Sequence, residues 1–416
     1  MALLRFVGLA LLCAPAGCEA TGDLRPIERL QVSSGGQGNG GVAGSAAGGK
    51  ATSGGCDGAL ADRDGDGYSA DDGDCDDCDP LRNAGAFDVG GNHVDDDCDG
   101  LVDNEATLCD QALSVTGDAH SAANALGVCR SVGANASGRE RRWGLLAARY
   151  VFPDGSSSSL PSDRAMDCAE ALVGPNELSH GILSSFGPNV TARQGSAFVA
   201  LSSGVARAGR QIEPLTDSDS PTGAFMCTRS LMPVGFPSLF HPSCGGGLSV
   251  SGVRSGDFTS AYDGIALELT LRAPTNARAV TFDSNFYSAE FPYSVCSLYS
   301  DNFAVFVRSA SAPTERNVVL DSQGDPMGVD NEFIEVCEPY LYQGVGFGGP
   351  ITRQFECSLG ESELEGSGFD ASANEGSHAA SGWLHTRASV AAGQDVTIRF
   401  AILGLRRRMA RFDRID

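Results

Sequence analysis

Lysine and histidine are scarce in this chain of 416 residues. Lys50 is its single lysine, so nearly all of the 29 basic residues are arginines, a bias that we attribute to the base composition of the genome. The 53 acidic residues leave a formal net charge of −24. A chain this acidic repels a phosphate backbone, so we expect no nucleic-acid partner.

Sequence motifs of the common catalytic sites are also missing. The chain contains no Gly-x-Ser-x-Gly elbow, no His-Glu-x-x-His zinc motif and no Walker loop. The six histidines stand without ligand spacing at His93, His120, His180, His241, His378 and His385. We therefore predict that the protein is not an enzyme.

Long hydrophobic runs are absent apart from one short stretch near the N-terminus. Residues 6–12 are apolar and follow Arg5, a run too short to span a bilayer and typical of a signal peptide. We predict that residues 1–17 are the signal peptide. Ala16-Gly-Cys18 resembles a bacterial lipobox, in which the cysteine is lipidated, although Pro15 stands where leucine is usual. We expect a lipid anchor at Cys18 and a location at the outer membrane or cell surface; the alternative is ordinary signal-peptidase cleavage near residues 14–16.

Cysteine usage agrees with export. Removing Cys13 and Cys18 from the fourteen cysteines leaves an even number, which predicts disulfides in an extracytoplasmic protein. Their connectivity cannot be deduced from the sequence. Cys75 and Cys78 form a lone Cys-x-x-Cys pair, so zinc is not indicated, and either of them paired with Cys98 would link two acidic loops.

A tether is predicted between the anchor and the first folded residues. Within residues 18–55, the part from 33 to 55 is rich in Gly, Ser and Ala and almost uncharged. Such a segment cannot bury enough apolar surface to offset its ordering entropy. We expect a flexible linker with a reach of roughly 25–30 Å.

Aspartate is concentrated in residues 56–108, the predicted calcium module. Asp62-Arg-Asp-Gly-Asp-Gly-Tyr68 and Asp95-Asp-Asp-Cys-Asp-Gly100 place carboxylates at alternate positions before a glycine, the pattern of a calcium loop. A solvated acidic linker would not need this regular spacing. The predicted ligands are Asp62, Asp64, Asp66, Asp71 and Asp74 in the first loop and Asp95, Asp97, Asp99 and Asp103 in the second.

Both loops differ from an EF-hand. Gly73 and Ala106 occupy the twelfth position, where an EF-hand has a bidentate Glu, and no helical periodicity flanks either loop. The loops are closer to those of thrombospondin type 3 or dockerin modules. We therefore predict structural Ca²⁺ bound at about 10⁻⁴–10⁻³ M. Copper is disfavoured because hard oxygen donors stand there without His or Met clusters.

Residues 109–416 are predicted to form a mainly-β domain, an antiparallel β-sandwich with a few helices. Apolar residues alternate with other residues in 265–271 and 396–402, which is typical of strands. This alternation predicts one buried and one wet face. Further strands are expected at 278–286, 302–308 and 316–320, and Gly-, Pro- and Ser-rich turns separate the candidates.

Two helices are expected near the start of this domain. Asp118 can cap a helix over 119–126, with Gly127 as its end. Ser162 can cap a second over 163–173, with Gly174 as its end.

Residues 62–105 resemble the metal-binding motif repeated in many surface lipoproteins of myxobacteria. The resemblance rests on Gly73-Asp-Cys-Asp-Asp77 and Asp97-Cys-Asp-Gly-Leu-Val-Asp103. That family usually has Pro-Gly-Ala and one more cysteine before the second loop, where this chain has Asn83-Ala-Gly-Ala86. The resemblance implies aspartate ligands for a metal, with Cys78 in place of the missing cysteine.

Residues 179–402 are similar to the choice-of-anchor L domain. The similar segments are 266–271, Phe286-Tyr-Ser-Ala-Glu290-Phe-Pro292, Tyr299-Ser-Asp301-Asn-Phe303, Gly382-Trp-Leu384 and 396–401. The resemblance implies an exported β-rich protein, fixed to the surface, with no established enzymatic activity. Glu290 and Asp301 either bind an ion or a partner, or satisfy loop amides. The family ends in a further strand, whereas residues 404–416 are basic and unpatterned, so we expect that strand to be missing or altered.

These observations predict an exported, lipid-anchored, calcium-binding surface protein with an adhesive or scaffolding role. The expected partners are calcium and an unidentified surface protein or polysaccharide. The alternative is a secreted hydrolase that carries the calcium module as an accessory. A pocket that gathers Ser, His and carboxylate groups would favour this alternative.

Overall fold

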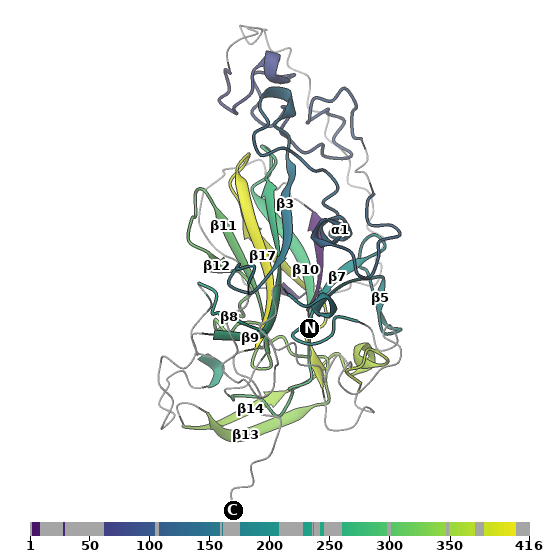
Figure 1. The fold of residues 1–416 in the computed structure, drawn as a ribbon, viewed down its shortest axis with the longest axis vertical. Coiled ribbons are helices and arrows are strands. Elements are labelled where there is room, and N and C mark those ends of the chain that lie inside the picture. The colour runs from purple at the N-terminus through teal and green to yellow at the C-terminus, as the bar shows by residue number, and fades with distance from the viewer. Residues whose placement is uncertain are drawn as a thin grey trace, which may run out of the picture.

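The computed structural model consists mainly of antiparallel β-sheet (Figure 1). The described residues are 2–8, 28–29, 62–104, 108–158, 160, 175–207, 228–234, 236, 242–244, 260–297, 301–346, 349–370 and 378–404. Every ladder between named strands is antiparallel, and one α-helix accompanies them in this part of the chain. The predicted mainly-β antiparallel fold is confirmed, and its assignment as a sandwich stays a prediction.

A six-stranded sheet contains both segments with the clearest alternation. Its order is β12 (Arg316–Asn317), β11 (Asp301–Ser309), β17 (Asp395–Gly404), β9 (Ser260–Arg272) and β3 (Gly144–Val151), and β8 (Arg229–Leu231) also pairs with β9. The register sets Leu267 opposite Phe400 and Leu269 opposite Ile398. Apolar side chains therefore face one another across the central pair of strands.

A seven-stranded sheet supplies the other large layer. Its order is β2 (Glu28–Arg29), β16 (Leu384–Ser389), β10 (Ala279–Ser288), β1 (Ala2–Gly8), β7 (Phe198–Leu201) and β4 (His180–Leu183), and β15 (Ala379–Ala380) also pairs with β10. Phe282 of β10 meets Phe400 of β17 with ring centroids 5.2 Å apart, so the two sheets share one apolar core.

The prediction that one face of β9 is exposed to solvent is wrong at Glu268. This residue is only 4% exposed. Its carboxylate accepts hydrogen bonds from Arg149 of β3, at 2.6 and 2.8 Å, and from Arg399 of β17, at 3.1 Å. Arginines on the two neighbouring strands cover the glutamate, and their charge makes its burial tolerable.

The first predicted helix is confirmed as α1 (Ala119–Ala125). The Asp118 carboxylate accepts the Ser121 amide at the helix start, and Gly127 follows its end with φ of 84°. Ala122 and Ala123 are fully buried, which lets the helix pack closely on the sheets. The second predicted helix, over 163–173, lies outside the described residues.

Short elements complete the described part. They are the 3₁₀ helices η1 (Ala70–Asp72), η2 (Gly138–Glu140), η3 (Glu177–Ser179), η4 (Pro242–Cys244) and η5 (Ser362–Leu364), and the strand pairs β5 (Ser185–Phe186) with β6 (Val190–Thr191) and β13 (Tyr340–Gly346) with β14 (Gly349–Phe355). Residues 62–104 lie at one end of the long axis and the β13–β14 hairpin at the opposite end (Figure 1). No helix among the described residues is long and apolar enough to cross a membrane.

Strand β1 falls within the predicted signal peptide. It pairs with β10, where Leu4 lies opposite Ser284, and with β7, where Leu4 lies opposite Val199. The prediction that residues 1–17 are removed therefore has a structural consequence, because their loss separates β10 from β7. The prediction of a missing or altered last strand falls on residues 405–416, which lie outside the described part. Strand β17, which precedes them, lies between β11 and β9.

Four disulfides occur among the described residues. They join Cys75 to Cys98, Cys109 to Cys129, Cys244 to Cys296 and Cys337 to Cys357. Of the two alternatives for Cys98, the structure selects Cys75. Disulfides in this number indicate an oxidising, extracytoplasmic compartment.

Candidate metal centre

The first acidic loop is held together by its own backbone. Gly65 and Gly67 have φ of 81° and 97°, a left-handed conformation that glycine adopts without strain. These turns direct both amides at Asp62, whose two carboxylate oxygens accept them at 2.7 and 3.0 Å. The glycines of the motif thus fold the loop back onto its first aspartate.

The next two aspartates each close a turn of their own. Asp64 accepts the amide of Asp66 at 3.2 Å, and Asp66 accepts the amide of Tyr68 at 2.8 Å. Carboxylate oxygens of Asp62, Asp64 and Asp66 consequently lie within 4.8 Å of one another. Two oxygens that bind one Ca²⁺ at 2.3–2.6 Å lie at most about 5 Å apart, so this group has the size of a calcium shell.

The second loop repeats this arrangement. Asp95 accepts the amides of Asp99 and Gly100 at 3.2 and 3.0 Å. Carboxylate oxygens of Asp95, Asp97 and Asp99 again lie within 4.8 Å of one another. Asp97 is 1% exposed, and its Oδ1 has no hydrogen-bond partner within the described part of the chain.

Two arginines approach the other oxygen of Asp97. Arg130 and Arg142 place guanidinium nitrogens 3.5 and 3.9 Å from Oδ2. They hold Oδ2, while Oδ1 is left without a hydrogen-bond partner among the described residues. A carboxylate that is held through one oxygen in this way can offer its other oxygen to a metal ion.

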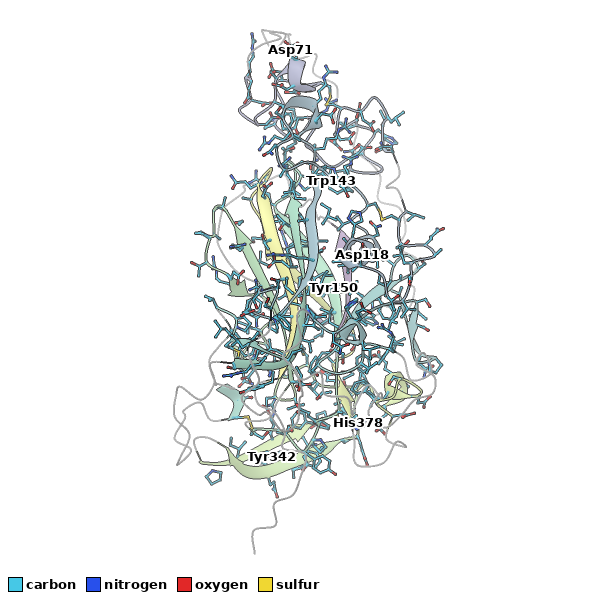
Figure 2. The ribbon with its side chains drawn as sticks, viewed as in Figure 1. Asp71, Asp118, Trp143, Tyr150, Tyr342 and His378 are labelled. Atoms are coloured by element: carbon cyan, nitrogen blue, oxygen red, sulfur yellow. A yellow bond between two sulfur atoms is a disulfide. The ribbon has the colours of Figure 1, made fainter. Side chains whose placement is uncertain are left out.

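The remaining predicted ligands are placed differently. Asp74 joins Asp64 and Asp77 in a third group whose oxygens also lie within 4.8 Å of one another. Asp71 lies exposed on η1, far from the sheets (Figure 2), and belongs to none of the three groups. Asp103 accepts the amides of residues 91–93 at 2.7–3.1 Å, so in the structure its carboxylate holds a turn.

Asp77 was missed by the sequence reasoning, which followed the Asp-x-Asp-x-Asp-Gly motif alone. It lies three residues after Asp74, and the Cys75–Cys98 disulfide holds this segment against the second loop. The signal that could have found it is the repeated acid after the cysteine, in Asp74-Cys-Asp-Asp77.

The charged carboxylates of each group repel one another unless a cation lies among them. Two unit charges separated by 4.8 Å repel by roughly 3 kcal/mol at an effective dielectric of 20. Burial raises the pKa of Asp66 to about 6, and burial together with the neighbouring carboxylates raises the pKa of Asp64, Asp74 and Asp97. The surroundings of these carboxylates thus disfavour their charged form, and a cation bound among them would restore it.

The loops are fastened to the β-sheets through Asn83, which is fully buried. Its amide donates to Asp66 Oδ2 at 2.6 Å, and its carbonyl oxygen accepts the Thr275 hydroxyl at 2.7 Å. Thr275 lies between β9 and β10. Close by, Phe87 packs on Trp143, which stands where the module meets the strands (Figure 2).

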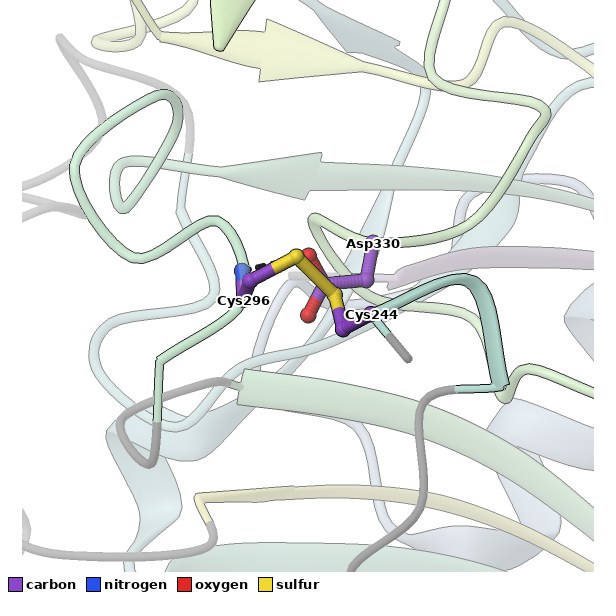
Figure 3. Close-up of side chains that lie close together, drawn as sticks. All are labelled: Cys244, Cys296 and Asp330. Carbon is purple, nitrogen blue, oxygen red and sulfur yellow. Dashed lines mark hydrogen bonds between the residues drawn. A yellow bond between two sulfur atoms is a disulfide. The ribbon is translucent and has the colours of Figure 1, made fainter. Parts of the chain in front are cut away.

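A fourth group, Cys244, Cys296 and Asp330, is a disulfide with a carboxylate beside it (Figure 3). Asp330 accepts the amide of Cys296 at 2.7 Å. Sulfurs joined in a disulfide are not thiolate ligands, so this group is structural.

The parts of a catalytic triad occur at separate places. Asp283 lies 2.8 Å from Nδ1 of His385, without a serine at the other nitrogen in the described structure. Ser131 lies 3.4 Å from Nε2 of His120, which has no hydrogen-bonded carboxylate in the same part. The geometry therefore gives the hydrolase alternative no assembled site within the described residues.

The two acids at the most recognisable positions of the β-domain contact loop groups. Glu290 accepts the amide of Asp301 at 2.7 Å. Asp301 in turn accepts the hydroxyl of Ser203. These contacts favour the second of the two roles that the sequence left open, the satisfaction of loop groups.

No protein-family model, curated protein or solved structure matches the chain. The resemblances to the myxobacterial metal-binding motif and to the choice-of-anchor L domain therefore stay predictions.

Proposed function

We propose that the chain is an exported surface protein whose acidic module is stabilised by Ca²⁺ and which has an adhesive or scaffolding role. The observation that carries the proposal is Asp97. Its carboxylate is almost fully buried beside those of Asp95 and Asp99, and its Oδ1 has no hydrogen-bond partner within the described part. A buried, unpaired carboxylate oxygen among others is costly without a cation.

Calcium suits these donors best. The groups consist of aspartate oxygens alone, which hard cations prefer, whereas zinc and copper select nitrogen and sulfur. Calcium also accepts irregular shells, while Mg²⁺ demands a near-ideal octahedron.

The arrangement of the molecule supports display at a surface. The predicted anchor at Cys18 and the linker to residue 55 precede the module in the sequence. The β13–β14 hairpin lies at the other end of the long axis (Figure 1), where Tyr340 is 37% and Leu341 47% exposed. Exposed aromatic and aliphatic side chains of this kind are what a surface protein or polysaccharide contacts.

The test is thermal and chemical unfolding of the oxidised protein with and without calcium. At 10 mM Ca²⁺ and a Kd of 10⁻⁴–10⁻³ M, each site adds about 1–3 kcal/mol to the free energy of unfolding. Equal stability in excess chelator and in calcium would contradict the proposal. Release of the Cys18→Ser protein from cell membranes, with the parent protein retained, tests the lipid anchor separately.

A further inference from the structure

Asp64 belongs to two of the carboxylate groups. It lies with Asp62 and Asp66 on one side and with Asp74 and Asp77 on the other, and each group is compact enough for one cation. The first loop thus gathers five carboxylates around a shared member, whereas the second loop has a single group of three in the described structure.

The three aspartates of the second group have one oxygen each held by the backbone. Asp64, Asp74 and Asp77 accept the amides of Asp66, Asp76 and Arg63 at 3.2, 2.7 and 3.1 Å. In each case the bonded oxygen is Oδ1, which fixes the carboxylate in one orientation.

The other oxygen of each carboxylate has no hydrogen-bond partner among the described residues. Oδ2 of Asp64, Asp74 and Asp77 is buried and makes no hydrogen bond to any described residue. Asp74 and Asp77 are only 6% and 4% exposed as whole residues. Three carboxylates within 4.8 Å of one another, each with a buried oxygen that no described residue satisfies, point to a cation as their ligand.

Asp62 and Asp66 differ from these three residues. Both oxygens of Asp62 accept backbone amides, and those of Asp66 accept the Tyr68 amide and the Asn83 side chain. Arg82 does not supply the missing charge, because its guanidinium pairs with Asp76 at 2.7 Å. One cation among Asp62, Asp64 and Asp66 would leave Asp74 and Asp77 uncompensated.

We propose that the first loop holds two calcium ions with Asp64 as the shared ligand. Asp62 and Asp66 supply further ligands of the first ion, and Asp74 and Asp77 supply further ligands of the second. The inference rests on the proposed calcium function and adds a metal site and its ligand Asp77. With the single ion of the second loop, the described module binds three calcium ions per chain.

The experiment counts calcium bound to the full exported protein by equilibrium dialysis, with isothermal titration calorimetry for affinities. We expect three ions for the parent protein, two for Asp77→Asn and one for Asp64→Asn, because the shared ligand serves both ions. Asp79→Asn is the matched control. It removes one charge from the same module outside every group, keeps the Leu81 contact through its amide oxygen, and should still bind three ions.

The readings separate this inference from the proposed function. Two ions in the parent protein, and an unchanged number in Asp77→Asn, would overturn the paired site while the calcium function stands. No bound calcium in the parent protein would overturn both. An intact Cys75–Cys98 disulfide and unchanged near-ultraviolet circular dichroism show that a variant is folded; if Asp77→Asn fails this check, Asp74→Asn takes its place with the same expected loss of one ion.

Discussion

At the scale of single residues, the sequence spacing predicted which aspartates of the candidate metal centre come together. Alternate aspartates and left-handed glycines are a local device, so Asp62, Asp64 and Asp66 come together without help from distant residues. Asp77 escaped prediction because its place is set by packing and a disulfide. Asp103 stays a predicted ligand, and in the structure its carboxylate accepts the amides of the turn at residues 91–93.

Asp74→Asn should stabilise the calcium-free protein and weaken its stabilisation by calcium. The asparagine keeps the contact with the Asp76 amide and removes a buried charge whose pKa burial has raised. In chelator we expect the free energy of unfolding of the variant to exceed that of the parent protein by about 1 kcal/mol. The increase in this free energy on adding calcium should be smaller for the variant than for the parent protein. Urea unfolding in both conditions measures this, and a variant that is less stable in chelator would contradict the explanation.

His180 gives the fold a pH dependence of predictable sign. Burial, aided by the Arg207 guanidinium, lowers the pKa of His180 from 6.5 to about 4. The unfolded chain therefore binds more protons between these values, so the free energy of unfolding falls as pH drops from 6.5 to 4 and then levels off. The loss is roughly 3 kcal/mol at most.

Urea unfolding between pH 4 and 7 measures this dependence, and His180→Gln should remove the histidine contribution to the slope. The ring of Tyr150 stacks on His180 at 3.7 Å, so the variant loses some stability at every pH. The test is therefore the slope of the free energy of unfolding against pH. An unchanged slope would refute the assignment of this pH dependence to His180.

At the scale of elements, prediction succeeded where the pattern was local. Alternation located β9 and β17, and a cap with a glycine end located α1 almost to the residue. Alternation did not predict β3, because its sequence Gly-Leu-Leu-Ala-Ala-Arg has no clear period of two. The solvent-exposed face predicted for β9 was wrong at Glu268, because the arginines that cover this residue, Arg149 and Arg399, lie on the neighbouring strands.

The N-cap of α1 is open to a direct test. Asp118→Ala removes the acceptor for the Ser121 amide, which lies at 2.8 Å, and should lower the free energy of unfolding by about 1 kcal/mol. Asp118→Asn is the matched control, because asparagine caps helices equally well. Equal losses in the two variants would show that charge, and not the cap, matters here.

At the scale of the whole molecule, β1 is the feature with the largest consequence. If export removes residues 1–17, β10 and β7 lose the strand between them and present facing edges with unpaired backbone groups. We expect a chain that begins at Cys18 to show fast amide exchange at these edges and to tend to associate.

A synthetic peptide of residues 2–8 added to that chain should restore slow exchange in β7 and β10, because β1 matches both strands in register. The same peptide with Leu4→Pro is the control, since proline has no amide hydrogen to donate and is excluded from central strands. N-terminal mass determination of the exported protein shows whether residues 1–17 are removed. Equal protection of β7 and β10 in the two chain lengths without peptide would mean that the edges close on each other, and that β1 is dispensable to the sheet.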